Sequence, residues 1–119
     1  MTVSDFTDLR FTRDRAGQRY TIGMESYSPN LTVVRAAGEL DMSARADLMD
    51  TLDGALRADC VVLLDLSAVE FMYSGAASVI VDAAERSGGR LELFAPTRPA
   101  RRVLDALGAS TIGAYPTQD

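Results

Sequence analysis

The order of apolar and polar positions changes period several times along the chain, as expected of alternating strands and helices. Apolar residues alternate with polar ones over residues 20–24, and turn-forming residues at 28–30 separate this stretch from a second apolar run over 31–37. The two stretches predict a β-hairpin. Apolar residues then recur at helical spacing over 48–56, which predicts a helix with Ser43 as its N-cap.

The second half of the chain repeats this change of period. The continuous apolar run 60–64 is typical of a central strand that helices cover on both faces. After it we expect a loop at 65–72, a helix at 75–87 that ends at Gly88, a strand at 91–94, a helix from its cap Thr97 to Gly108, and a short strand near 111–114. The predicted fold is an α/β domain with a mixed β-sheet, helices packed against it and the order β-β-α-β-α-β-α.

Residues 1–18 contain few apolar side chains, with Phe6, Leu9 and Phe11 set among charged and polar positions. These are too few for a separate core, so we expect an N-terminal extension or an edge strand. One domain over 19–119 is expected to follow, because no repeat, linker or low-complexity tract divides that part of the sequence.

The composition excludes most enzyme chemistry. The 119 residues include 12 basic ones, all of them Arg, with no Lys and no His. The lack of Lys excludes the phosphate-binding loop that ends in Lys, and the lack of His excludes imidazole catalysis and zinc sites built from Cys and His. We therefore expect no enzyme activity, no cofactor and no metal site.

The charge and the single cysteine narrow the choice of partner and compartment. A net charge of −5 repels nucleic acid and anionic membranes, so we expect a protein partner and neither of those two. No run approaches the roughly 20 apolar residues of a membrane span, and the N-terminus lacks the apolar stretch of a signal peptide. Cys60 has no second cysteine to pair with and is expected to be buried. These features predict a cytoplasmic protein.

Three segments, in this order, resemble the motifs of STAS domains, the fold of bacterial anti-sigma factor antagonists. They are 38–41 (GELD), 61–69 (VVLLDLSAV) and 71–76 (FMYSGA). The family typically has G-E-L-D, then a hydrophobic strand followed by D-L-S-x-V, then F-[IM]-D-S-[STA]-G. Tyr73 stands where the family usually has Asp, and Gly75-Ala76 replaces a small residue followed by Gly. The similarity covers residues 20–108.

The resemblance implies a mechanism. In such proteins the Ser at the start of the second helix is phosphorylated by a partner that is both kinase and anti-sigma factor. The unphosphorylated form binds this partner and frees the sigma factor. The matching phosphorylation site is Ser74, and the expected partner contacts are Asp41, Tyr73, Ser74 itself, Gly75 and Ala76. The expected partners are an anti-sigma factor serine kinase and a phosphatase.

Physical chemistry supports this role and also offers structural alternatives. A Ser in the first turn of a helix lies beside free backbone N–H groups, which tolerate the roughly −1.5 to −2 charges of an added phosphate. The structural alternatives are a helix N-cap for Ser74, aromatic packing at the helix entrance for Tyr73, and a turn after a strand for Asp41.

We therefore expect a switch module that regulates sigma-factor-dependent transcription by docking an anti-sigma kinase. Two other functions stay open: a STAS scaffold protein that cannot be phosphorylated, and an accessory STAS subunit of a lipid or anion transport system. A further feature is the cluster of Arg98, Arg101 and Arg102 at the start of the third helix, which is either a solvated face or a surface for an acidic partner.

Overall fold

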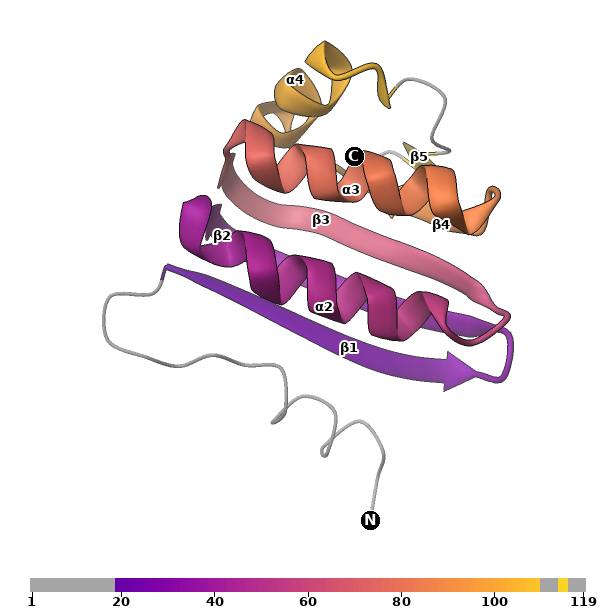
Figure 1. Cartoon of the computed structure of the whole chain (residues 1–119). Helices are drawn as coiled ribbons and strands as arrows, with labels where there is room; N and C mark the ends of the chain where they lie inside the picture. Colours follow the sequence, from indigo (N-terminus) through magenta and orange to yellow (C-terminus); the bar gives the residue numbers. More distant parts are fainter. Residues whose placement is uncertain (1–18, 110–113, 116–119) are drawn as a thin grey trace.

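The computed structural model describes residues 19–109 and 114–115. The predicted N-terminal extension, 1–18, and the first part of the predicted last strand, 111–113, lie outside the described residues. The described elements follow the predicted order (Figure 1). They are β1 (Tyr20–Ser28), β2 (Leu31–Leu40), the 3-10 helix η1 (Met42–Ala44), α2 (Arg45–Leu56), β3 (Val61–Met72), α3 (Ser74–Ser87), β4 (Leu91–Phe94), α4 (Arg98–Ala106) and β5 (Ala114–Tyr115).

The strands form one mixed sheet in the order β1-β2-β3-β4-β5. β1 runs antiparallel to β2, and the other neighbouring strands are parallel. Figure 1 shows α2 and α3 side by side across one face of the sheet, while α4 contacts β3 and α3. Because the parallel strands point the same way, the segments that follow β2, β3 and β4 gather at one edge. We call this edge the carboxyl edge.

The core lies between the sheet and the helices. It combines the strand residues that face the helices with the apolar stripe of each helix. Its largest fully buried side chains are Ile22, Val34, Leu40, Leu48, Leu52, Val62, Leu64, Leu66, Val69, Met72, Ile80 and Leu104. Burial of each such side chain stabilises the fold by about 1.5–3 kcal/mol. Cys60 is buried as predicted, with its sulfur 3.5 Å from the Thr32 hydroxyl.

The prediction that helices cover both faces of the central strand is wrong for the described residues. Helices flank β3 on the core side, whereas Val61 at its start is 39% exposed on the opposite face. That face carries both apolar and charged side chains. On it, Arg35 of β2 pairs with Asp65 of β3. A mixed face of this kind is tolerated in water, as it is in many sheets with one solvated side.

The loop predicted at 65–72 is also wrong, because β3 continues through it to Met72. The buried residues Leu66, Val69 and Met72 are three positions apart, which conceals the strand period of two. This spacing arises because the register between β2 and β3 shifts twice, and β3 gains one extra residue at each shift. Asp65 stabilises the first shift, because its Oδ1 accepts from the amide (2.9 Å) and the hydroxyl (2.7 Å) of Ser67.

The caps of the helices agree with two of three predictions. Gly88 ends α3 in the left-handed conformation (φ 63°), and Thr97 caps α4 by accepting from the Ala100 amide at 3.4 Å. Ser43 is not the cap of the first helical segment. The cap is Asp41, two residues earlier in the chain, whose carboxylate accepts from the Ser43 amide at the start of η1.

None of the helices in the described part of the chain has the length and apolar character of a membrane span.

Candidate partner-docking site

Two of the sequence motifs meet at the carboxyl edge of the sheet. β2 and β3 are paired as far as Leu40 and Met72, and the next amide, that of Tyr73, donates to the Leu40 carbonyl at 3.0 Å. Asp41 follows directly after β2, and Ser74 begins α3 just after β3. The fold therefore brings Asp41, Tyr73 and Ser74 to one edge, although the two motifs lie far apart in the sequence.

The last part of β2, which leads to Asp41, depends on Gly38. Its φ is 87°, and a Cβ atom at this position would overlap the carbonyl oxygen of Arg19. The close approach lets the Glu39 amide donate to that carbonyl at 2.8 Å, while Nη1 of Arg19 lies 3.0 Å from Oε1 of Glu39. The glycine of the GELD segment is thus required by the packing of two backbones.

Asp41 holds the turn from β2 into α2. Its Oδ1 accepts from the amide of Ser43 at 3.0 Å and from the Ser43 hydroxyl at 2.6 Å. The hydroxyl bond, followed by smaller contributions that include the charge of Arg19, holds the pKa of Asp41 below its usual value. The turn interpretation of Asp41 is therefore correct. Both of these bonds go to Oδ1, so neither occupies the second carboxylate oxygen, Oδ2.

Ser74 is the first residue of α3, and its side chain is exposed. The N-cap position belongs to Tyr73, whose carbonyl accepts from the amides of Ala76 (3.1 Å) and Ala77 (3.2 Å). The interpretation of Ser74 as the helix N-cap is therefore wrong, and its hydroxyl makes no hydrogen bond within the described part of the chain. The free amides of the first turn and the positive end of the helix dipole favour an anion at this position.

Tyr73 and Gly75 form a pair at the start of α3. The Tyr73 side chain is half-buried against the core and turns back over Gly75, so that a Cβ atom at position 75 would overlap the phenol oxygen and the ring. The structural alternative for Tyr73, packing at the helix entrance, is therefore observed. Glycine at position 75 makes room for this ring.

Ala76 and Ala77 have no exposed surface. Both pack beneath the first turn of α3, where their small size lets the helix approach the sheet closely. The side chain of Ala76, expected as a partner contact, therefore offers no surface to a partner in this conformation. Of the expected partner contacts in this motif, Tyr73, Ser74 and Gly75 are half-buried or exposed, and so is Phe71, which was not among them.

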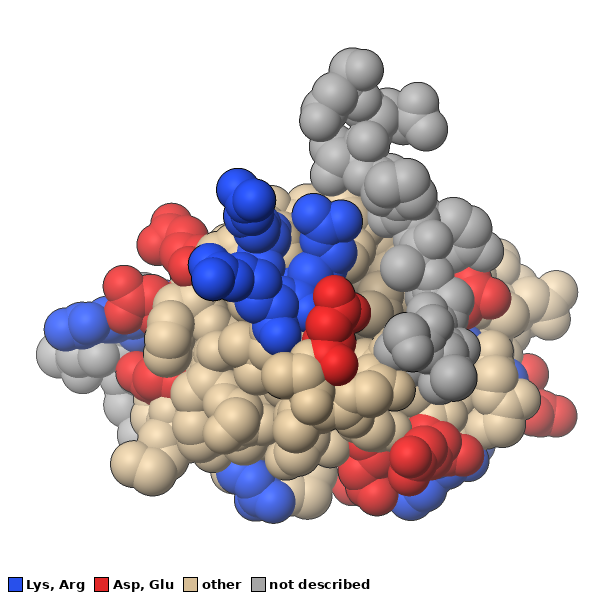
Figure 2. All heavy atoms as spheres, turned by 90° about the horizontal axis from the view of Figure 1, so that it is seen from above, with Lys and Arg blue, Asp and Glu red and all other residues tan. Residues whose placement is uncertain are grey.

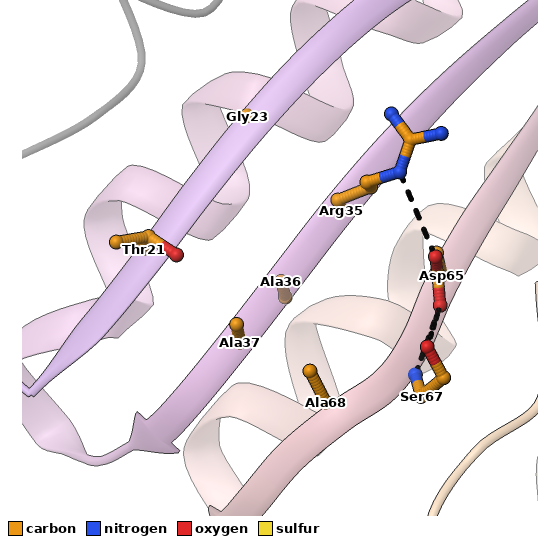
Figure 3. A pocket seen from close by; sticks show the side chains of 8 residues that line it. All are labelled: Thr21, Gly23, Arg35, Ala36, Ala37, Asp65, Ser67 and Ala68. Atoms are coloured by element: carbon orange, nitrogen blue, oxygen red, sulfur yellow. Dashed lines mark hydrogen bonds and ion pairs between the residues drawn. The ribbon is translucent and has the colours of Figure 1, made fainter.

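A second feature, which the sequence analysis did not single out, is a hollow of about 250 Å³ on the face of the sheet opposite the helices (Figure 3). Its lining residues are Thr21, Gly23, Arg35, Ala36, Ala37, Asp65, Ser67 and Ala68. The hollow exists because small residues on three neighbouring strands leave space beside Arg35. Apart from Ala36, which belongs to the core, these residues are half-buried or exposed, and their outward strand positions were the available signal in the sequence.

The charged groups of this hollow are already paired. Nη1 of Arg35 lies 2.8 Å from Oε1 of Glu25, its Nη2 donates to the Tyr27 hydroxyl at 2.6 Å, and its Nε lies 3.7 Å from Oδ2 of Asp65. The hollow therefore presents no unsatisfied charge to a ligand. Within residues 19–109 and 114–115, no group of three or more Cys, Asp or Glu side chains is arranged to hold a metal ion.

Comparison with known families gives one match. A family model described as "Mlab, STAS domain" matches residues 24–114, which include both motifs of the carboxyl edge. Among curated protein sequences, none matches this chain significantly.

Several solved structures share the fold. An anti-sigma factor antagonist from Mycobacterium paratuberculosis is 27% identical, covers 87% of this chain and 92% of its own, and superposes with a TM-score of 0.75. The anti-sigma factor antagonist SpoIIAA in its unphosphorylated form is 20% identical over 82% of this chain and 89% of its own, with a TM-score of 0.68. The Bacillus cell fate determinant SpoIIAA in its phosphorylated form is 19% identical over 82% of this chain and 92% of its own, with a TM-score of 0.65. At these lower identities the two SpoIIAA structures show the fold alone.

Proposed function

The chain belongs to the STAS domain family, and on that basis we propose that it is an anti-sigma factor antagonist switched by phosphorylation of Ser74. The unphosphorylated chain binds an anti-sigma factor that is also a serine kinase, and this binding frees a sigma factor. A phosphatase restores the binding form. The general role is supported by the 27% identity to an anti-sigma factor antagonist. The role requires a cytoplasmic location, in agreement with the sequence-based prediction.

The observation that carries the proposal is the state of the Ser74 hydroxyl. It is exposed at the first residue of α3 and takes no part in capping the helix. A hydroxyl that stabilised the helix would be costly to modify, whereas this one can be phosphorylated without loss of an internal bond. The helix dipole also favours the added negative charge.

The modification is a phosphoryl transfer from ATP bound to the kinase. The Oγ atom of Ser74 attacks the γ-phosphorus, the bond to this phosphorus forms, and the bond between the phosphorus and the bridging oxygen of ADP breaks. The hydroxyl proton passes to a base of the kinase. Hydrolysis by the phosphatase uses water to return Ser74 and release inorganic phosphate.

The added charge is large enough to act as a switch. A phosphoserine carries about −1.5 to −2 charges. A like charge of the partner about 4 Å away opposes binding by about 4 kcal/mol per unit of charge at an effective dielectric constant near 20. That energy weakens binding about a thousandfold. No change of fold is needed, because the new charge acts directly at the docking surface.

Asp41 and Tyr73 complete the proposed contact surface. The carboxylate of Asp41 offers Oδ2 as an acceptor. This carboxylate stays ionised, because its pKa lies below the usual value. Tyr73 supplies an aromatic ring of the kind that anchors protein interfaces. Both lie at the same edge as Ser74, so one partner surface can contact all three.

A scaffold protein that is not phosphorylated is the second candidate, and Tyr73 is the observation that favours it. Its ring lies over Gly75 at the start of α3, the residue that directly follows Ser74. In a scaffold, the same edge would contact other STAS proteins, and the charge at position 74 would not control binding.

A capture experiment with three baits tests the proposal. The wild-type chain, Ser74→Glu and Ser78→Glu are exposed to an extract of the native cells, and mass spectrometry identifies the retained proteins. Ser78 is the matched control, because it is also exposed on α3 but lies one turn further along. We expect a small ATP-dependent kinase to be retained by the wild type and by Ser78→Glu and to be lost with Ser74→Glu.

The captured kinase is then incubated with ATP and the chain. We expect phosphate on Ser74 in the wild type and none in Ser74→Ala. The scaffold function is supported instead if all three baits retain the same STAS proteins and the chain takes up no phosphate.

A further inference from the structure

The first turns of α4 carry three arginines whose charges are not neutralised. Arg98, Arg101 and Arg102 are exposed, and their guanidinium groups make no ion pair or hydrogen bond with another described residue. Figure 2, viewed from above, shows blue side chains gathered on the face that carries α4. We call these three residues the α4 arginine cluster.

Most other described arginines behave differently. Four of them bind a carboxylate or a set of carbonyls, namely Arg19, Arg35, Arg86 and Arg90. Arg45 and Arg57 are exposed without an ion pair, but each stands alone on its segment. The α4 cluster therefore concentrates unpaired positive charge on a chain whose net charge is −5.

The isolated chain gains no stability from this arrangement. Arg98 lies three and four positions before Arg101 and Arg102, and like charges at these spacings repel on a helix surface. All three lie toward the N-terminal end of α4, where the helix dipole disfavours cations. The cost amounts to a few tenths of a kcal/mol per contact, so the cluster is better explained by an external anionic partner than by folding.

The fold ties the cluster to the carboxyl edge. The Thr97 hydroxyl, which caps α4, donates to the Val69 carbonyl on β3 at 2.8 Å. Val69 lies in the last part of the strand that leads to Ser74, and α4 also contacts α3. In Figure 1 the helix α4 lies beside the start of α3. The start of α4, which carries the cluster, is therefore held against the part of β3 that leads to Ser74.

We propose that the α4 arginine cluster binds an acidic segment of the protein partner that docks at Ser74. This inference rests on the proposed function and adds the chemistry of the partner's contact surface. The arginines attract the partner's carboxylates and orient the partner before the short-range contacts at Asp41, Tyr73 and Ser74 form.

A protein carboxylate surface fits better than a nucleic acid or a lipid bilayer. The rest of the chain is acidic, and its field repels an extended polyanion that has to run past the cluster. Asp105, exposed one turn further along α4, adds a negative charge close to the arginines. A short acidic segment can contact three guanidinium groups without meeting these charges.

The test uses the triple variant R98E/R101E/R102E of the full chain and the kinase identified by its Ser74-dependent capture. Acidic residues in the first turns of a helix are favourable, so the variant should fold, and circular dichroism during thermal unfolding checks this. Arg57→Glu is the matched control, because it is an exposed, unpaired arginine at the far end of α2. Association rates are measured by stopped flow at low and at high salt.

We expect the triple variant to associate at least about tenfold more slowly than the wild type at low salt, and the difference to shrink at high salt. Arg57→Glu should associate at nearly the wild-type rate. Equal rates for the wild type and the triple variant would overturn the inference and leave the switch at Ser74 intact. If capture of the kinase does not depend on Ser74, the proposed function is overturned, whatever rates the triple variant gives.

A second measurement does not need the kinase. A decaglutamate peptide and a DNA decanucleotide are titrated separately into the isotope-labelled chain and followed by NMR. Peptide-induced shifts confined to α4, absent from the triple variant, support the inference. Tighter binding of DNA than of peptide at α4 overturns the choice of an acidic protein, as does the absence of peptide-induced shifts there.

Discussion

At the start of α3, two neighbouring side chains depend on each other. Tyr73 occupies the N-cap position without a side-chain capping bond, and its ring turns back over Gly75. A Cβ atom at position 75 and the ring of Tyr73 would occupy the same space. The two departures from the family's usual motif are thus linked, because the aromatic ring at one position requires glycine at the other.

Gly75→Ala is expected to displace the Tyr73 ring. Overpacking of this kind lowers the free energy of unfolding by about 1–3 kcal/mol, which urea denaturation can measure. Gly54→Ala is the control, because a Cβ there would meet no described residue outside the adjoining backbone of α2. Alanine should stabilise the middle of α2 by up to about 1 kcal/mol relative to glycine.

The same substitution in a Tyr73→Ser background isolates the contact. Without the ring, Gly75→Ala should no longer be destabilising. If its effect on the free energy of unfolding is unchanged in this background, the contact between ring and glycine does not explain the residue at position 75.

The charge of Asp41 has a predictable pH dependence. Its pKa in the folded chain is lowered, chiefly by the Ser43 hydroxyl, so its contribution to stability is present above the pKa of an unfolded aspartate. That contribution is lost as the pH falls through the folded pKa. We expect Ser43→Ala to raise the pKa of Asp41, as measured by NMR of the carboxyl carbon. An unchanged value would mean that the hydroxyl bond is not the main cause.

At the scale of whole elements, one arginine joins three segments at the edge opposite Ser74. Arg90, just before β4, donates through Nη1 to the carbonyls of Ala58 (2.8 Å) and Cys60 (2.9 Å) and through Nη2 to that of Leu56 (3.2 Å). It therefore satisfies the last carbonyl of α2, where the helix dipole favours a cation, and two carbonyls of the turn that follows. The contact fixes the turn between α2 and β3.

Arg90→Ala is expected to lower the free energy of unfolding by about 1.5–3 kcal/mol, the range for hydrogen bonds that involve a charged group. The reason is that the carbonyls of Leu56, Ala58 and Cys60 lose this donor. Urea denaturation measures the change, and Arg57→Ala, which removes an exposed and unpaired arginine nearby, should change stability by less than about 0.5 kcal/mol. Similar values for the two variants would show that the carbonyl contacts contribute little.

For the molecule as a whole, the core and the candidate site are separate. The core lies between the sheet and the helices, while Ser74 lies at the carboxyl edge with its side chain exposed. A negative charge at position 74 meets no buried group and stands at the positive end of α3. Binding can therefore change without unfolding.

We expect Ser74→Glu to leave the melting temperature within a few degrees of the wild-type value, because surface substitutions usually change stability by less than about 0.5 kcal/mol. Thermal unfolding followed by circular dichroism measures this. A large drop in melting temperature would mean that loss of partner binding in this variant reports unfolding rather than a switch.

Local patterns in the sequence suffice for much of this description. The order of the strands and helices, the hairpin, the end of α3 at Gly88 and the cap at Thr97 all follow from periodicity and from residues a few positions apart. These features depend on interactions within one element or between elements adjacent in the chain, which the sequence displays directly. The motifs around Asp41 and Ser74 were likewise visible as continuous stretches.

Other features depend on contacts between distant segments, and only the tertiary structure decides them. β3 extends through 65–72 because its pairing with β2 shifts register, which no period within β3 reveals. Ser74 escapes the capping role because Tyr73 occupies that position, and Ala76 is buried because α3 lies close to the sheet. The α4 arginines remain unpaired because the fold brings no carboxylate of another described element within reach of them.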